Sequence, residues 1–376
     1  MVQRKSNIEL LRIFAAWMIV SYHVACGLGY HPFLSETHFS PLVEWTSIIF
    51  GSWGILGVDL FWIISAYFMQ DQNFRSKKIL TIVFQVLCFE LLFTVAEFGY
   101  TCVHQGVPMG CKTILLLWTD QILQPLWSQD YWFFTTYIFL YILSPWLNQI
   151  IQLKSEIQLR KLLIILSFIP FYSNFWVGTP PVANIVNFVY IYLLVGYLKK
   201  WNQQAWIENH AWQGMLCISI SVILSQWLYH VFPSQGVKGM IRNFLPYITG
   251  NINRHSAILW LDALFIFYAF KNLKIKSSKI INLIVSCTLG IYLFHENPVF
   301  VPMKDLVKKF FITSLGEATI LKYFPTYFFL STILLFMMGF FVEYIRKNVL
   351  DKYVLPNLIK KCSQKIERTD HWFEKI

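Results

Sequence analysis

Charged residues are scarce in this chain of 376 residues. Asp, Glu, Lys and Arg make up 14% of it, whereas roughly 25% is usual in a soluble globular protein. Hydrophobic residues make up 56%, too many to be hidden in a water-soluble core. The composition therefore excludes a disordered chain and a soluble enzyme that carries a single anchor.

Several familiar motifs are also missing. The sequence has no glycine-rich phosphate loop, no Cys and His spacing typical of a metal site, and no internal repeat. The seven cysteines are an odd number and lie mostly in apolar runs, which excludes a small secreted domain held together by disulfides. We accordingly predict a protein without a bound metal.

Apolar runs that can cross a bilayer are abundant. A transmembrane helix needs about 17 to 25 predominantly apolar residues. Ten runs between polar breaks have roughly this length, at 8–28, 45–69, 79–99, 131–151, 161–178, 184–198, 211–231, 256–270, 280–301 and 323–345. We therefore predict an all-α, polytopic membrane protein of about ten transmembrane helices. Its transmembrane domain spans 1–346, and a basic cytoplasmic tail spans 347–376.

Positive charge is distributed unevenly along this pattern. The net charge is +11, and with the N-terminus inside, 22 of the 31 Lys and Arg residues fall on the cytoplasmic side. Lys and Arg accumulate on cytoplasmic loops of membrane proteins. The bias predicts that both termini are cytoplasmic. It also assigns the basic excess to membrane topology rather than to a nucleic-acid partner.

The first predicted span carries two polar residues, Arg12 and His23. They are eleven residues apart, which places them on one face of a helix and roughly 16 Å apart along its axis. This spacing suits a site that holds an anionic group near the cytoplasmic mouth and performs proton chemistry higher up. The alternative is a snorkelling Arg12 and a histidine satisfied within the core.

Two further ionisable residues fall near the middle of predicted spans. Asp59 lies about 14 residues into the second span, and His295 about 15 residues into the ninth. A carboxylate at this depth needs a cation or a histidine as its partner. Because a histidine titrates near working pH, His23, Asp59 and His295 are predicted to form a proton-transfer cluster.

Aromatic residues mark the outer end of the fourth span. Tyr131 and Trp132 follow Asp130 directly. Such residues commonly form the aromatic belt at the membrane interface. They are equally suited to stack on a sugar ring, so we treat Tyr131 and Trp132 as candidate substrate-binding residues.

Motifs along most of the chain resemble those of the acyltransferase 3 family of bacterial integral-membrane acyltransferases. Arg12 and His23 match its Arg-x10-His signature. The other similar segments follow in the expected order, at 57–61, 64–68, 131–145 and 289–295. The resemblance implies a multi-pass enzyme of the bacterial plasma membrane in which the residues matching Arg12 and His23 are essential.

The resemblance also implies the reaction. Family members transfer an acyl group, commonly acetyl from acetyl-CoA, to a hydroxyl of a cell-surface polysaccharide or of its lipid-linked precursor. The expected partners are thus acyl-CoA as co-substrate, a glycan or lipid-linked saccharide acceptor, and the bilayer. Where the family has an arginine-rich entry to the third span, this chain has Arg75, Lys77 and Lys78, which we predict to bind the phosphates of CoA. Lysine binds phosphate only as a point charge, so the contacts to the donor differ from those of an arginine pair.

The expected mechanism assigns the proton to a histidine. His23 removes the proton from the attacking hydroxyl, Arg12 holds a phosphate or polarises the thioester carbonyl, and Asp59 or His295 orients His23. An acyl-His23 intermediate is an alternative to direct attack. Two other functional classes fit a chain of this kind, a glycan flippase or exporter and a polysaccharide polymerase.

Overall fold

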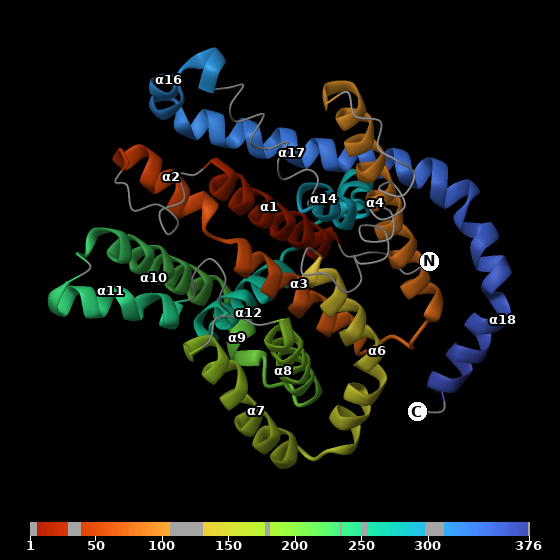
Figure 1. Ribbon diagram of the computed structural model, residues 1–376. Coiled ribbons are helices and arrows are strands. Elements are labelled where there is room, and N and C mark those ends of the chain that lie inside the picture. Colours follow the sequence, from red (N-terminus) through yellow and green to blue (C-terminus); the bar gives the residue numbers. More distant parts are fainter. Residues whose placement is uncertain are drawn as a thin grey trace. The chain divides into compact units, whose positions relative to one another are not determined.

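The computed structural model describes residues 6–28, 39–105, 131–176, 181–233, 235–249, 255–297 and 312–374. It is 87% helical, and no strand occurs in these residues. The elements in Figure 1 are α1 (Ser6–Leu28), α2 (Pro41–Gly51), α3 (Gly54–Met69), α4 (Ser76–Gln105), α6 (Trp132–Leu153), α7 (Glu156–Trp176), α8 (Pro181–Lys200), α9 (Ala205–Asn209), α10 (Ala211–Val231), α11 (Gly236–Thr249), α12 (Ala257–Lys271), α13 (Lys279–Val285), α14 (Thr288–His295), α16 (Glu317–Lys322), α17 (Phe324–Arg346), the π-helix η1 (Lys347–Asp351) and α18 (Leu355–Glu374). The predicted all-α class is confirmed.

Within the described residues, helices overlap all ten predicted spans. Five of the described helical stretches are long and apolar enough to cross a membrane, at Ser6–Gly27, Pro41–Met69, Ser76–Ala96, Ala211–Val231 and Phe324–Asp351. The protein is therefore an all-helical, multi-pass membrane protein. Ten crossings and cytoplasmic termini stay predictions, as does a domain boundary at residue 346.

Two predicted spans are broken in the structure. The run 45–69 is divided into α2 and α3 between Gly51 and Gly54, and the run 280–301 begins with two short helices, α13 and α14. At the first break, a Cβ on Gly51 would lie 2.6 Å from the Cβ of Ala25, and one on Gly54 would lie 2.6 Å from the Tyr22 ring. The glycines thus let the broken segment lie directly against α1.

Contacts divide the chain into two compact units. Unit 1 comprises Met1–Gln72, Trp146–Ser286 and Ile312–Leu334, and unit 2 comprises Asn73–Pro145, Cys287–Phe311 and Leu335–Ile376. The division falls within α6 and within α17. Each unit is therefore assembled from segments that are far apart in the sequence.

Unit 1 is organised around α1, α3 and α12. A Cβ on Gly57 of α3 would lie 2.7 Å from the backbone oxygen of Ala15, so α1 and α3 pack with their backbones close together. The Asn7 side chain donates to the carbonyls of Lys271 and Leu273, at 2.9 and 3.2 Å. This ties the start of α1 to the end of α12, most of whose residues are buried.

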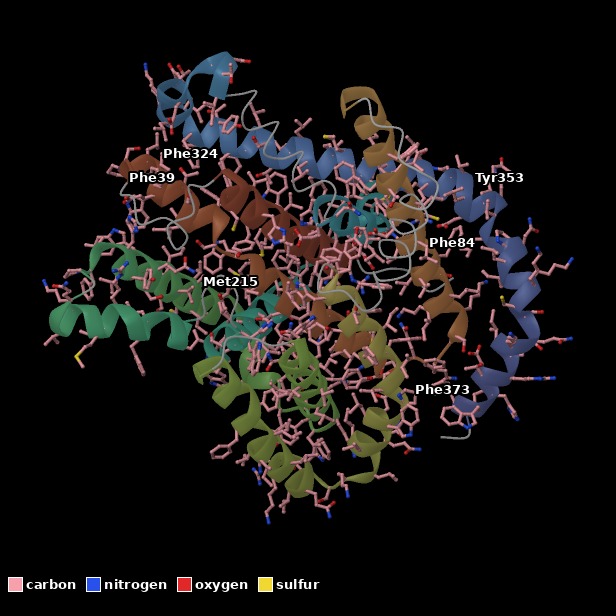
Figure 2. The ribbon with its side chains drawn as sticks, viewed as in Figure 1. Phe39, Phe84, Met215, Phe324, Tyr353 and Phe373 are labelled. Carbon is pink, nitrogen blue, oxygen red and sulfur yellow. The ribbon has the colours of Figure 1, made fainter. Side chains whose placement is uncertain are left out.

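Unit 2 has its own hydrophobic core. It consists of Val86, Phe89, Phe93, Tyr131, Phe134, Leu293 and Phe294. A Cβ on Gly339 of α17 would lie 2.9 Å from the Cα of Ile291, so α14 packs closely against α17. The C-terminal helix α18 packs on the start of α4, where the rings of Phe74 and Phe373 stack with centroids 3.7 Å apart. Figure 2 labels Phe373 and shows the nitrogen-tipped side chains that project from α18.

Candidate functional site

Arg12 is held on α1 by a neighbouring carboxylate. Its Nη1 donates to both carboxylate oxygens of Glu9, at 3.1 and 3.0 Å. The guanidinium also lies over the Phe68 ring, 5.7 Å from its centroid, and 30% of the Arg12 side chain is exposed. Arg12 is thus positioned within unit 1 but still accessible to a ligand. Glu9 was not among the predicted site residues, although its spacing three residues before an arginine indicates such a pair.

His23 lies further along the same helix. Because α1 is continuous from Ser6 to Leu28, Arg12 and His23 stay on one face, about 16 Å apart along the axis. The half-buried His23 ring packs beside Tyr22, with centroids 5.0 Å apart. The helix therefore presents a cation and an ionisable ring at two levels of the same face.

Asp59 is paired with a histidine that the sequence did not single out. Its Oδ1 lies 2.7 Å from Nδ1 of His255, just before α12, and both side chains are buried. In the neutral tautomer that donates from Nδ1 to this carboxylate, Nε2 of His255 has the lone pair. The expected histidine partner of Asp59 is therefore present, but it is His255 rather than His23 or His295.

The orientation of Asp59 explains this pairing. Gly57 faces the α1 backbone, and Asp59 is two residues on, which rotates it by about 200° around α3 and away from α1. His255 is fixed from a second side by Trp62, whose ring stacks on the imidazole with centroids 4.6 Å apart. No local sequence signal identifies His255, because it lies 196 positions from Asp59 in the chain.

His295 lies in unit 2 at the end of α14. Its Nδ1 is 2.7 Å from the Ile291 carbonyl oxygen, an acceptor only, so Nδ1 carries the proton and a neutral ring would have its lone pair on Nε2. Nε2 lies 3.7 Å from a carboxylate oxygen of Glu296. His295 is thus a buried histidine whose backbone contact fixes its orientation.

The two predicted sugar-stacking residues have different environments. Tyr131 is fully buried in the core of unit 2, where its hydroxyl donates to the Leu293 carbonyl at 3.1 Å and accepts from Asn297 at 2.8 Å. Asn297 also donates to Glu90 at 3.1 Å. Trp132, by contrast, is half-buried. Tyr131 therefore belongs to an internal polar network, and Trp132 is the more accessible ring.

Arg75, Lys77 and Lys78 gather at the start of α4. Arg75 and Lys77 are exposed, and the Lys78 ammonium lies 4.4 Å from the centroid of the Tyr141 ring. The backbone N–H of Ser76 donates to Oδ1 of Asp370 on α18, at 2.6 Å. A helix N-terminus with three cations favours an anion, and a carboxylate of the chain itself already occupies one of its donors.

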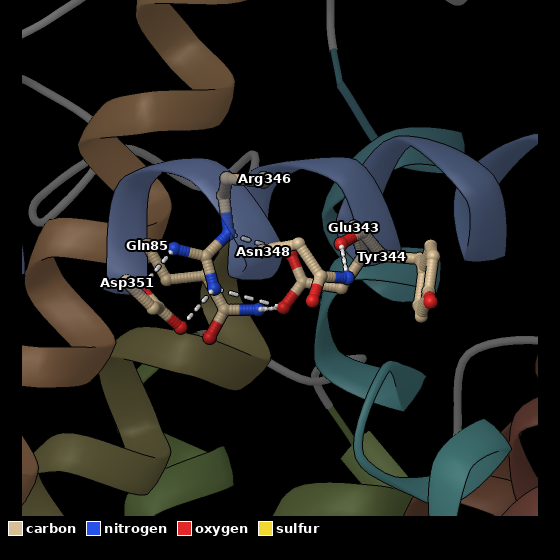
Figure 3. Close-up of polar contacts among 6 residues, drawn as sticks. All are labelled: Gln85, Glu343, Tyr344, Arg346, Asn348 and Asp351. Atoms are coloured by element: carbon tan, nitrogen blue, oxygen red, sulfur yellow. Dashed lines mark hydrogen bonds and ion pairs between the residues drawn. The ribbon is translucent and has the colours of Figure 1, made fainter. Parts of the chain in front are cut away.

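Unit 2 also contains a buried ionic network, shown in Figure 3. Arg346 donates from Nε and Nη2 to Glu343, at 2.7 and 2.9 Å, and from Nη1 and Nη2 to Asp351, at 2.7 and 3.0 Å. Gln85 of α4 donates to Glu343 at 2.9 Å. A Cβ on Gly290 would lie 2.4 Å from the Cβ of Glu343, so the network also abuts α14. Each carboxylate oxygen in it has a partner, as expected of a structural connection between helices.

Comparison with protein families identifies one match. The model of an acyltransferase domain, acyltransferase 3, matches residues 5–345. No curated protein and no solved structure is significantly similar to the chain. The match includes every predicted site residue, from Arg12 on α1 to His295 on α14.

Proposed function

Since the chain belongs to the acyltransferase 3 family and is a membrane acyltransferase, we propose that it O-acylates a cell-surface polysaccharide or its lipid-linked precursor. The donor in this proposal is acyl-CoA, with acetyl-CoA as the co-substrate, and the enzyme works in the bacterial plasma membrane. The observation that carries the proposal is the pairing of a family match over residues 5–345 with a continuous α1 that bears Arg12 and His23 on one face.

The start of α4 supports the assignment of the donor. Phosphate groups bind where backbone N–H groups and cations converge, and Arg75, Lys77 and Lys78 surround such a helix end. The rings of Tyr137 and Tyr141 lie beneath the Lys78 ammonium and hold it near this end. We assign these three cations to the phosphates of acyl-CoA.

The chemistry is assigned to the face of α1. His23 takes the proton of the acceptor hydroxyl as its oxygen bonds to the acyl carbon, the bond from that carbon to sulfur breaks, and the proton passes to the departing CoA thiolate. Arg12, fixed by Glu9, stabilises the charge that develops on the carbonyl oxygen or holds a phosphate. An acyl-His23 intermediate would divide the same bond changes between two steps.

The other candidate residues support the reaction from their own positions. His295 is oriented by Ile291, which suits a second proton acceptor, and Asp59 acts through His255. Trp132 is the better placed of the two rings for stacking on a sugar, because Tyr131 is enclosed in the core. These roles are secondary to that of His23.

Replacement of His23 tests the proposal. His23→Ala should abolish acetylation of the surface polysaccharide at normal protein abundance, and Arg12→Lys should impair it severely because the planar guanidinium fork is lost. Mass spectrometry of the glycan with each variant, and with the gene deleted, measures the acetyl increment. Normal acetylation by His23→Ala would overturn the assignment. Loss of the polymer itself on deletion, or its retention inside the cell, would instead support a polymerase or an exporter.

A further inference from the structure

A group of buried polar atoms in unit 1 has no hydrogen-bond partner within the described residues. Asn187 on α8 is 0% exposed, and both its Nδ2 and its Oδ1 are unpaired. Oδ1 of Asn184, on the same helix, is buried and unpaired as well. Buried polar groups are nearly always hydrogen-bonded, so a concentration of exceptions calls for a physical reason.

The two asparagines face the pair formed by Asp59 and His255. On α8 the Phe188 ring contacts Trp62 of α3, and the Tyr190 ring lies 5.4 Å from that of Trp260 on α12. At about 100° per residue, Asn187 and Asn184 fall in the sector between Phe188 and Tyr190. Their amides therefore project between α3 and α12.

The same space is bordered by Asp59 and His255. Trp62 stacks on His255, and the Trp260 indole interacts with the Asp59 carboxylate. In the tautomer that donates from Nδ1 to Asp59, Nε2 of His255 can accept a hydrogen bond from a ligand. Helix geometry thus directs the two asparagine amides of α8 toward the buried region that Asp59 and His255 border.

The chemistry of these groups selects a neutral, hydroxyl-bearing ligand. An asparagine amide both donates and accepts, and a histidine nitrogen with a lone pair accepts from an O–H group. No lysine or arginine among the described residues pairs with Asp59, and its carboxylate disfavours phosphate. A sugar satisfies such groups, whereas the phosphates of CoA do not.

We propose that Asn184, Asn187 and the His255–Asp59 pair form a binding site for the acceptor sugar. This inference rests on the proposed function, because it takes the hydroxyl acceptor from there. The amide of Asn187 bonds to one sugar hydroxyl, and Nε2 of His255 accepts from another. The site orients the acceptor, and the hydroxyls of the acceptor supply the hydrogen bonds that these buried polar groups lack within the chain.

Asn187→Leu provides the sharpest test, because it separates stability from binding. Leucine has the same branched side-chain shape as asparagine and removes two unpaired buried polar atoms, so the unfolding temperature should rise or stay constant. The acceptor KM should increase by about tenfold or more, since a hydrogen bond to a buried hydroxyl is lost, while the acetyl-CoA KM should change less than about twofold. Full-length protein in lipid nanodiscs, labelled acetyl-CoA, and polysaccharide purified from cells that lack the gene allow each KM to be measured.

Asn148→Leu is the matched control in the same unit. Asn148 on α6 accepts a hydrogen bond from the hydroxyl of the buried Tyr192 at 2.7 Å. Its replacement should therefore lower the unfolding temperature and leave the acceptor KM unchanged, the opposite pattern from Asn187→Leu. His255→Gln should raise the acceptor KM in the same way as Asn187→Leu and provides a second variant if that protein does not accumulate.

Thermal unfolding with added polysaccharide distinguishes the two proposals. A bound ligand stabilises the folded state, so the purified polysaccharide should raise the unfolding temperature of the wild type and not that of Asn187→Leu. Equal shifts, or an unchanged acceptor KM, would overturn this site. A wild type that is stabilised by the polysaccharide but transfers no label would overturn the proposed function and leave the binding site supported.

Discussion

Units 1 and 2 each bury a cluster of polar side chains, but the two clusters differ in how completely they are hydrogen-bonded. In unit 2, Arg346 satisfies both oxygens of Glu343 and of Asp351, and Gln85 completes the network. In unit 1, Asp59 is bonded to His255, but Oδ1 of Asn184 and the amide of Asn187 have no partner in the described residues. A complete network stabilises helices against one another, whereas an incomplete one retains donors and acceptors for a ligand.

Breaking the complete network should produce the largest effect on stability. Arg346→Ala leaves Glu343, which is 0% exposed, without its cation. Removing one partner of a buried ion pair typically costs about 3–5 kcal/mol. We expect a protein that unfolds at a much lower temperature or fails to accumulate in the membrane, as measured by thermal unfolding in nanodiscs and by immunoblotting.

Glu343→Gln is the control for this variant. It removes a negative charge from a network with two carboxylates and one guanidinium, and Arg346 keeps its bonds to Asp351. The loss of stability should therefore be clearly smaller than for Arg346→Ala. Equal losses would show that the packing of these side chains, rather than the charge of Arg346, maintains the network.

Breaking the incomplete cluster should have a smaller effect on stability and a larger one on transfer. Asp59→Leu removes the partner of the buried His255, which typically costs about 1–3 kcal/mol. Because the ring is no longer oriented, the acceptor KM should increase as well. Asp59→Asn retains an acceptor for Nδ1 and should restore most of the stability. If both variants bind the acceptor normally, the Asp59–His255 pair is only a structural contact.

The helices of both units could largely be predicted from the sequence, because their positions depend on apolar runs. The helix α10, Ala211–Val231, occupies the predicted run 211–231, and α1 contains the predicted run 8–28. The break between α2 and α3 could not be predicted. It depends on how closely Gly51 and Gly54 approach α1, which is a tertiary contact with no periodicity of its own.

In the candidate site, too, residues related by local spacing could be predicted, whereas contacts between distant segments could not. Arg12 and His23 lie on one helix, so their spacing alone predicts that they share a face. The partner of Asp59 could not be predicted, because His255 precedes a helix that is distant in the sequence. The unpaired amide of Asn187 was equally hidden, since an asparagine in an apolar run gives no indication of whether its partners are present.

The smallest predicted effect concerns a half-exposed contact of unit 2, where Asp370 of α18 accepts from the backbone N–H of Ser76 at the start of α4. Loss of a carboxylate at a helix N-terminus typically costs about 0.5–2 kcal/mol, so Asp370→Ala should lower the unfolding temperature only slightly and increase hydrogen exchange in α18.

Under the proposed function, the same carboxylate of Asp370 competes with the phosphates of the donor for the backbone N–H of Ser76 and for the neighbouring cations. Its removal should therefore lower the acetyl-CoA KM by about twofold to fivefold, the magnitude expected of one charge at a helix end. Glu367→Ala removes an exposed acid from the same helix and should change neither quantity, so an equal decrease in KM for both variants would indicate a general charge effect rather than competition at α4.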